Sequence, residues 1–169
     1  TVIPEIDPID PVKVERLIMC SGKVYYDLLD KRRSEGREDI AIVRIEQLYP
    51  FPEEDLAEVL APYQNLKNII WCQEEPMNQG AWYCSQHHMR RVATAHKREL
   101  FLQYAGREAS AAPAVGYASM HAEQQEKLLQ RCGIAYREHT SEDDDHQIQH
   151  HGHRIHIIHS CLREYERTA

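Results

Sequence analysis

The chain has 169 residues and a formal net charge of −7, which suits one domain with a hydrophobic core and room for a tail. The acidic balance gives no support to a nucleic-acid partner or to an anionic membrane. No apolar run approaches the length of a transmembrane helix. The five cysteines are odd in number and scattered, so we interpret them as free thiols, mostly buried, in the reducing environment of the cytoplasm.

Residues 1–13 are predicted to be a linker from an upstream domain, because they are acidic, contain three prolines and show no hydrophobic period. Beyond them, apolar runs predict four strands, at residues 16–20, 39–45, 69–72 and 99–104. Helical spacing predicts one helix after each strand, over residues 24–35, 52–61, 80–93 and 121–132.

Strands that alternate with helices predict an α/β fold, here a three-layer α/β/α arrangement with a mostly parallel sheet over residues 14–133. The strand at 39–45 is almost continuously apolar and is therefore expected to be central. From 134 to 169 the composition changes, and this segment contains seven of the eleven histidines and an acidic run. We predict that it is a polar tail, disordered or non-native.

The turn Ser21-Gly22-Lys23 follows the first predicted strand and precedes a helix. Ser21 is a candidate N-cap, and the backbone N–H groups beside Lys23 can hold an anion. The alternative is simple capping with a solvated lysine, because three residues are far fewer than a phosphate-binding fingerprint requires.

The segment after the fourth predicted strand, residues 105–116, is rich in small residues and contains one arginine, Arg107. Small side chains leave room at the carboxyl end of a strand, where open sheets bind ligands. Arg107 can offer a planar fork to a phosphate, and the loop around Ser110 follows it closely. The alternative is that this segment packs against a neighbouring domain, and both interpretations remain open.

No catalytic residue and no metal site is predicted. Glu74 and Glu75 are adjacent on an extended chain, so their side chains point to opposite sides and make a poor acid–base pair. Cys84, His87 and His88 can suggest a metal cluster, but we favour a core cysteine with surface histidines because no fourth ligand is evident. The tail also has ligand spacing, which we interpret as accidental, at His150, His151, His153, His156, His159 and Cys161.

Four stretches of the chain match one protein family densely. They are CSGKVYYDL at 20–28, AIVRIEQLYP at 41–50, WCQEEPMNQGAW at 71–82 and PAVG at 113–116. Through them the chain closely resembles the C-terminal domain of bacterial 2-oxoglutarate dehydrogenase. The resemblance runs from about residue 5 to about residue 131, and the tail departs from the family pattern.

The resemblance implies a fold like the C-terminal domain of transketolase, in an enzyme with three α/β domains per protomer. The full enzyme decarboxylates 2-oxoglutarate on thiamine diphosphate with magnesium and passes the succinyl group to lipoamide in the citric acid cycle. The Gly-Asp-Gly motif of the family, which binds the diphosphate and magnesium, is absent from this chain. We therefore transfer no catalytic or cofactor-binding residue and expect the chain to be inactive alone.

The resemblance also implies partners: the upstream catalytic domains, a homodimer partner and the dihydrolipoyl succinyltransferase complex. In some family members this domain helps to form an allosteric site for AMP or acetyl-CoA. No family motif transfers those residues, and the positions that fit physically are Arg107, Ser110 and Lys23. The alternatives are the C-terminal domain of a 2-oxoadipate dehydrogenase, a free-standing nucleotide-binding α/β domain and a metal-handling protein.

Overall fold

The structure is a computed structural model that describes residues 1–111 and 118–134, with the side chains of 118–122 left out. All of these residues belong to the first of the two units into which the chain divides, Thr1–Tyr136. The strands are β1 (Val2–Ile3), β2 (Arg16–Cys20), β3 (Ile40–Ile45), β4 (Asn68–Pro76) and β5 (Leu102–Arg107). The helices are α1 (Val24–Ser34), α2 (Glu53–Leu60), α3 (Trp82–His96), α4 (Ala118–Arg131) and a short 3-10 helix, η1 (Pro11–Lys13).

The five strands form one sheet in the order β1-β3-β2-β4-β5. Strands β2 to β5 run parallel, and β1 runs antiparallel along β3. The predicted α/β class with a mostly parallel sheet is therefore confirmed. The apolar run at 39–45 had suggested that β3 is the central strand. The middle strand of the sheet is instead β2. Strand β3 is largely apolar on both faces because helices cover both faces of the sheet, and β1 pairs with its last two residues.

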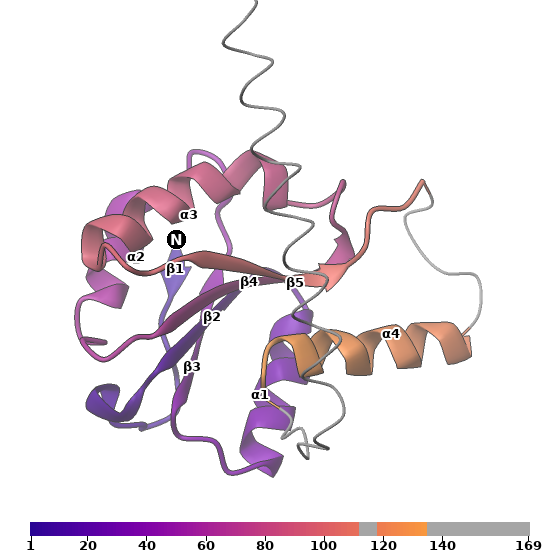
Figure 1. Ribbon diagram of the computed structural model, residues 1–169, viewed down its shortest axis with the longest axis horizontal. Coiled ribbons are helices and arrows are strands. Elements are labelled where there is room, and N and C mark those ends of the chain that lie inside the picture. The colour runs from indigo at the N-terminus through magenta and orange to yellow at the C-terminus, as the bar shows by residue number, and fades with distance from the viewer. Residues whose placement is uncertain (112–117, 135–169) are drawn as a thin grey trace, which may run out of the picture. The chain divides into compact units, whose positions relative to one another are not determined.

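Helices cover both faces of the sheet (Figure 1), with α2 and α3 on one face and α1 and α4 on the other. Side chains alternate across the pleat, so Leu17 and Met19 of β2 pack with the α2 and α3 side chains. Ile18 and Cys20 of the same strand pack with those of α1 and α4. Both faces of the interior strands are therefore buried, which explains why their sequences show continuous apolar runs.

The N-terminal segment, predicted to be a linker, forms the edge strand of this domain. Val2 pairs with Ile45 at the carboxyl end of β3. The ammonium group of Thr1 donates a hydrogen bond to Gln47 Oε1 at 2.9 Å. A two-residue strand with a distant partner leaves no periodic signal, so the sequence pattern did not reveal it.

A buried arginine ties the same segment to α1. Arg32 lies in a run of charged residues at the end of α1, yet it is only 2% exposed. Its guanidinium binds the carboxylates of Glu5 and Asp7 and donates to Ile40 O at 3.0 Å. Glu5 also accepts a hydrogen bond from Ile42 N at 2.8 Å. Because a buried charge is costly unless it is paired, this cluster makes the segment an integral part of the fold.

The packed part of the domain extends at least to Ile134, one residue beyond the predicted boundary at 133. Ile134 is fully buried, and Gly133 O accepts hydrogen bonds from Arg16 at 2.9 Å and Arg37 at 3.2 Å. The predicted tail beyond this point, with its candidate metal ligands, lies outside the described residues.

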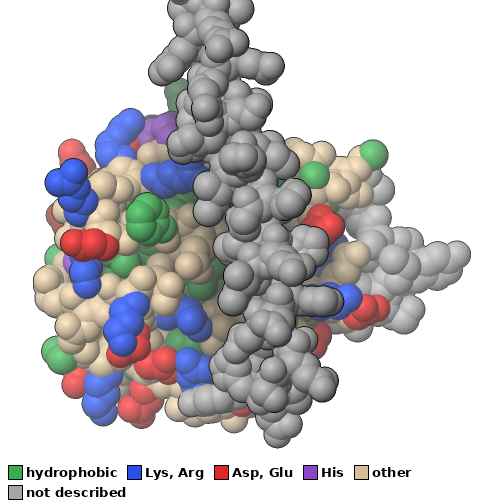
Figure 2. Space-filling view, in the orientation of Figure 1, with side chains coloured by type: hydrophobic (Ala, Val, Ile, Leu, Met, Phe, Trp, Pro, Cys, Tyr) green, Lys and Arg blue, Asp and Glu red, His purple; other side chains and the backbone are tan. Residues whose placement is uncertain are grey.

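The described surface carries charges of both signs. On the face shown in Figure 2, Lys and Arg side chains are interspersed with Asp and Glu, and hydrophobic side chains are isolated. Several large apolar side chains are nevertheless well exposed: Tyr49 at 93%, Phe101 at 78%, Val12 at 65% and Tyr26 at 62%. Among the helices that the structure describes, none has the length and apolar character needed to cross a membrane.

Candidate functional site

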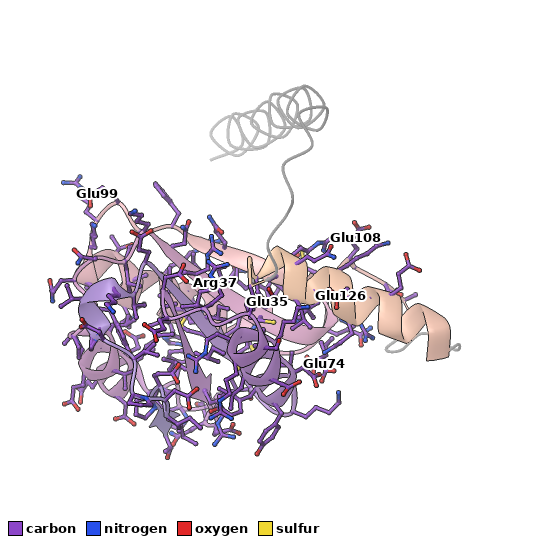
Figure 3. The ribbon with its side chains drawn as sticks, turned by 90° about the horizontal axis from the view of Figure 1, so that it is seen from below. Glu35, Arg37, Glu74, Glu99, Glu108 and Glu126 are labelled. Carbon is purple, nitrogen blue, oxygen red and sulfur yellow. The ribbon has the colours of Figure 1, made fainter. Side chains whose placement is uncertain are left out.

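The carboxyl ends of β2, β4 and β5 meet at one edge of the sheet, as expected for parallel strands. Pro76 at the end of β4 is in register with Arg107 at the end of β5. In Figure 3, Glu74 and Glu108 lie toward this end of the sheet, whereas Glu99, which precedes β5, lies toward the opposite end. This carboxyl edge contains all three candidate anion-binding residues.

The buried amide of Gln73 organises the loop that follows β4. Gln73 is 3% exposed, and its Oε1 accepts from Trp71 Nε1 at 2.9 Å and from Trp82 N at 3.0 Å. Its Nε2 donates to Gln79 O at 2.8 Å. Because both ends of the amide are satisfied, its burial costs little and fixes the loop against the start of α3.

The loop after β4 in turn holds the loop after β5. Asn78 Nδ2 donates to Ser110 O at 3.0 Å, and Ser110 N donates back to Asn78 Oδ1 at 2.9 Å. Gln79 Nε2 donates to the same carbonyl at 3.2 Å. The backbone N–H of Ser110 is thus occupied by the protein's own amide. Ser110 marks an anchored loop, and its binding of an anion stays a prediction.

Lys23 already binds a carboxylate. Its Nζ lies 2.5 Å from Glu74 Oε1, with the lysine side chain 69% exposed and the glutamate side chain 18% exposed. The hydrogen bond that Lys23 donates to Glu74 raises the pKa of Lys23, while partial burial and the nearby charge of Arg107 lower it. Ser21 is not the N-cap of α1; Lys23 holds that position without a side-chain cap.

Arg107 is the last residue of β5 and not part of the loop that was predicted to contain it. The strand begins at Leu102, three residues after the predicted start, because the apolar Leu100 is buried in a turn before the strand. Arg107 is half-buried, and its charge acts on Lys23. Two cationic side chains from β5 and from the β2–α1 turn therefore share the carboxyl edge.

The backbones of β4 and β5 approach closely beneath this edge. A Cβ at Gly106 would lie 2.3 Å from Tyr104 Oη and 2.9 Å from Gln73 O, so only glycine fits without a shift. Burial raises the pKa of Tyr104 to about 12, and the protonated phenol donates to Arg107 O at 3.1 Å. A hydrogen bond to the backbone, and not only side-chain contacts, therefore fixes the end of β5.

The suspected metal cluster on α3 does not form. Cys84 is exposed, so the prediction of a core cysteine is wrong. His87 is exposed, and His88 binds Glu53 of α2 through Nδ1 and stacks on Phe51 with ring centroids 5.1 Å apart. No group of three or more potential ligands within 1–111 and 118–134 is arranged to hold a metal ion.

Three other cysteines are buried free thiols, as predicted: Cys20, Cys72 and Cys132. Burial raises the pKa of Cys20, and contact with Cys132 together with burial raises the pKa of Cys72. The thiols of Cys20 and Cys72 are therefore held in the protonated form and are poor nucleophiles, and all three buried thiols belong to the core.

The carboxyl edge can bind charge but does not form an acid–base or nucleophilic centre among the described residues. Glu74 binds Lys23, whereas its neighbour Glu75 is exposed. The sequence indicated the cations but not the amides of Gln73 and Asn78 that shape the edge. The only local signal was an amide directly after an apolar run, which suggests a buried polar residue.

Comparison with known proteins agrees with this fold. The family model described as 2-oxoglutarate dehydrogenase C-terminal matches residues 1–132. The chain is 86% identical over 129 residues to the 2-oxoglutarate dehydrogenase E1 component of Azotobacter vinelandii. It is 57% identical over 130 residues to that of Haemophilus influenzae and 52% identical over 132 residues to that of Coxiella burnetii.

These matches cover 76% or 77% of this chain. The chain itself spans only 14% of the length of each of these curated relatives. The family match nevertheless includes the whole sheet and its four helices, from β1 to α4. The chain belongs to the family of 2-oxoglutarate dehydrogenase C-terminal domains.

Proposed function

We propose that this chain is the non-catalytic C-terminal domain of an E1 component that decarboxylates 2-oxoglutarate and passes succinyl to the dihydrolipoyl succinyltransferase complex in the cytoplasm. The observation that carries the proposal is the family match over residues 1–132. The three relatives described above are all named for 2-oxoglutarate, which favours this substrate over 2-oxoadipate. A free-standing nucleotide-binding domain is less consistent with relatives that are about seven times longer than the matched region.

Thiamine diphosphate and magnesium belong to the rest of such an enzyme. The described residues do not fit these groups, because they include no cluster of potential ligands arranged for a metal ion. The sequence also lacks a Gly-Asp-Gly motif. We assign no step of the decarboxylation to this chain, and its contribution is assembly and regulation.

The proposal is tested first by activity. The purified chain, supplied with thiamine diphosphate, magnesium and 2-oxoglutarate, should release no carbon dioxide above background. The full-length enzyme under the same conditions is the control. Turnover by the chain at a rate near that of the full enzyme would show that the domain is catalytic by itself.

Assembly is supported by the exposed apolar side chains. Phe101 and Tyr49 are mostly exposed, as are Val12 and Tyr26. On the face shown in Figure 2 the described surface otherwise carries many charged side chains. Aromatic side chains are enriched where protein surfaces meet. We propose that they contact the upstream catalytic domains and the homodimer partner.

Regulation is supported by the two cations of the carboxyl edge. Lys23 and Arg107 lie close enough for the charge of one to act on the other, and the loop that contains Ser110 is anchored to Asn78 at the same edge of the sheet. Phosphate groups are bound in proteins by such lysine and arginine pairs. We propose that the edge binds the phosphate of an effector such as AMP or acetyl-CoA.

Replacing Arg107 tests this effector site. In the full-length enzyme, Arg107→Ala should weaken effector affinity by roughly ten- to a hundredfold, because one charged hydrogen bond contributes about 1.5–3 kcal/mol. Turnover without effector should change little, because no catalytic residue is involved. Titration of the effector against both enzymes measures the difference. Unchanged affinity would leave Arg107 with a packing role only.

A further inference from the structure

Glu74 places an anion where the proposed effector phosphate would be held. Its carboxylate lies 2.5 Å from Lys23 Nζ, and Lys23 is also within reach of the charge of Arg107. The glutamate side chain is 18% exposed, so β4 and its neighbours hold it in place. The lysine side chain is 69% exposed and extends from a turn, so it can swing away. Figure 3 labels Glu74 at the carboxyl edge.

The two partners of this ion pair therefore differ in their freedom to move. A fixed carboxylate that binds a movable lysine neutralises it until another anion arrives. An incoming phosphate must break the hydrogen bond between Lys23 and Glu74 and must also tolerate the charge of Glu74 nearby. Both effects oppose binding of the phosphate, and both depend on one carboxylate.

We propose that the carboxylate of Glu74 competes with the effector phosphate for Lys23. It binds Lys23 when no phosphate is present and thereby sets the effector concentration at which the site fills. This inference rests on the anion site proposed above. Under it, Lys23 exchanges one anionic partner for another, so the ion pair with Glu74 is broken whenever phosphate binds. Glu74 thereby tunes the affinity of the site without contacting the reacting substrate.

The neighbouring glutamate provides a matched control. Glu74→Gln and Glu75→Gln remove the same charge from adjacent positions of β4, but Glu75 is exposed and pairs with no cation in the described residues. A difference between the two variants therefore reports the position of the carboxylate and not the net charge of the domain. Glutamine keeps the size of the side chain, so the strand and the Gln73 amide should be preserved.

The experiment measures inorganic phosphate binding to the 169-residue chain by following the backbone amide signals of Gly22 and Lys23 in NMR spectra, at constant ionic strength. Glu74→Gln should bind phosphate roughly tenfold more tightly than the wild-type chain, equivalent to about 1.4 kcal/mol. Glu75→Gln should bind like the wild-type chain, and Lys23→Met should lose binding. Should Glu74→Gln fold poorly, Glu74→Ser gives the same comparison.

Equal phosphate affinity of Glu74→Gln and Glu75→Gln would overturn the competition, and so would absence of phosphate binding in every variant. Failure of the effector site itself has a different signature. In that case Arg107→Ala leaves effector affinity in the full-length enzyme unchanged, whereas phosphate binding to the chain still distinguishes Glu74 from Glu75. The two proposals can therefore fail separately.

Discussion

At the scale of single residues, burial decides which ion pairs stabilise this domain. Glu15 and Lys67 form a pair at 2.7 Å, but their side chains are 50% and 63% exposed. The side chains of Glu5 and Arg32 are only 5% and 2% exposed. The sequence shows all four as ordinary charged residues. The sequence could not show which pair is buried. Arg32 is covered by the N-terminal segment, whose Glu5 lies 27 residues away in the chain and whose first strand pairs with β3.

Replacing Glu5 should therefore be costly. Glu5→Gln is expected to lower the free energy of unfolding by about 3 kcal/mol, because it leaves the buried Arg32 with less compensating charge, although Asp7 still binds it. Glu15→Gln, the matched surface control, should cost less than about 1 kcal/mol. Urea denaturation of both variants measures the difference, and equal losses would mean that the Arg32 cluster contributes no more than a solvated pair.

At the scale of elements, the hydrophobic period predicted the four parallel strands and four helices but not where the strands end. Strand β4 continues past the apolar run because Gln73 is buried with both ends of its amide satisfied. Strand β5 begins late because Leu100 is buried in a turn. The partners of Gln73 include backbone groups beyond the strand, and the turn before β5 is closed by a hydrogen bond from Leu100 N to Lys97 O. A hydrophobic period shows neither of these polar contacts.

The two loops at the carboxyl edge should behave as one unit through Asn78. Asn78→Ala removes the acceptor for Ser110 N and one donor to Ser110 O. We expect amide exchange at Ser110 to become roughly ten times faster, because loss of one hydrogen bond costs about 1 kcal/mol or more. Gln79→Ala is the control, because Gln79 contacts only the carbonyl. Similar exchange in the two variants would show that Asn78 does not brace the loop.

At the scale of the whole molecule, the predicted parallel sheet correctly implied that Lys23 and Arg107 lie at the same edge, where the carboxyl ends of the strands meet. A sequence of alternating strands and helices is enough to predict that residues after each strand gather there. The pairing of Lys23 with Glu74 could not be predicted, because it depends on strand order. Strand β2 lies beside β4, whose sequence is separated from it by β3 and two helices.

The C-terminal boundary of the domain can be measured by truncation. A chain that ends at residue 136 should keep the stability of the full chain, because the polar segment beyond it has little apolar area to bury. A chain that ends at Gly133 should lose about 2 kcal/mol, because the fully buried Ile134 is removed. Chemical denaturation of the two truncated chains compares them. Equal stability would place the boundary at 133, as the composition first suggested.

The direction of β1 decides from which side any preceding polypeptide reaches this domain. Because β1 is antiparallel to β3, Thr1 lies beside Gln47 at the same edge as Lys23 and Arg107. A parallel β1 would instead lead the preceding chain back along β3, away from this edge of the sheet. A protein joined ahead of Thr1 therefore arrives at the same edge of the sheet as Lys23 and Arg107, with β3 between β1 and β2 and three strands between β1 and β5. The two-residue strand β1 thus places any preceding domain and a ligand bound by Lys23 on the same side of the sheet.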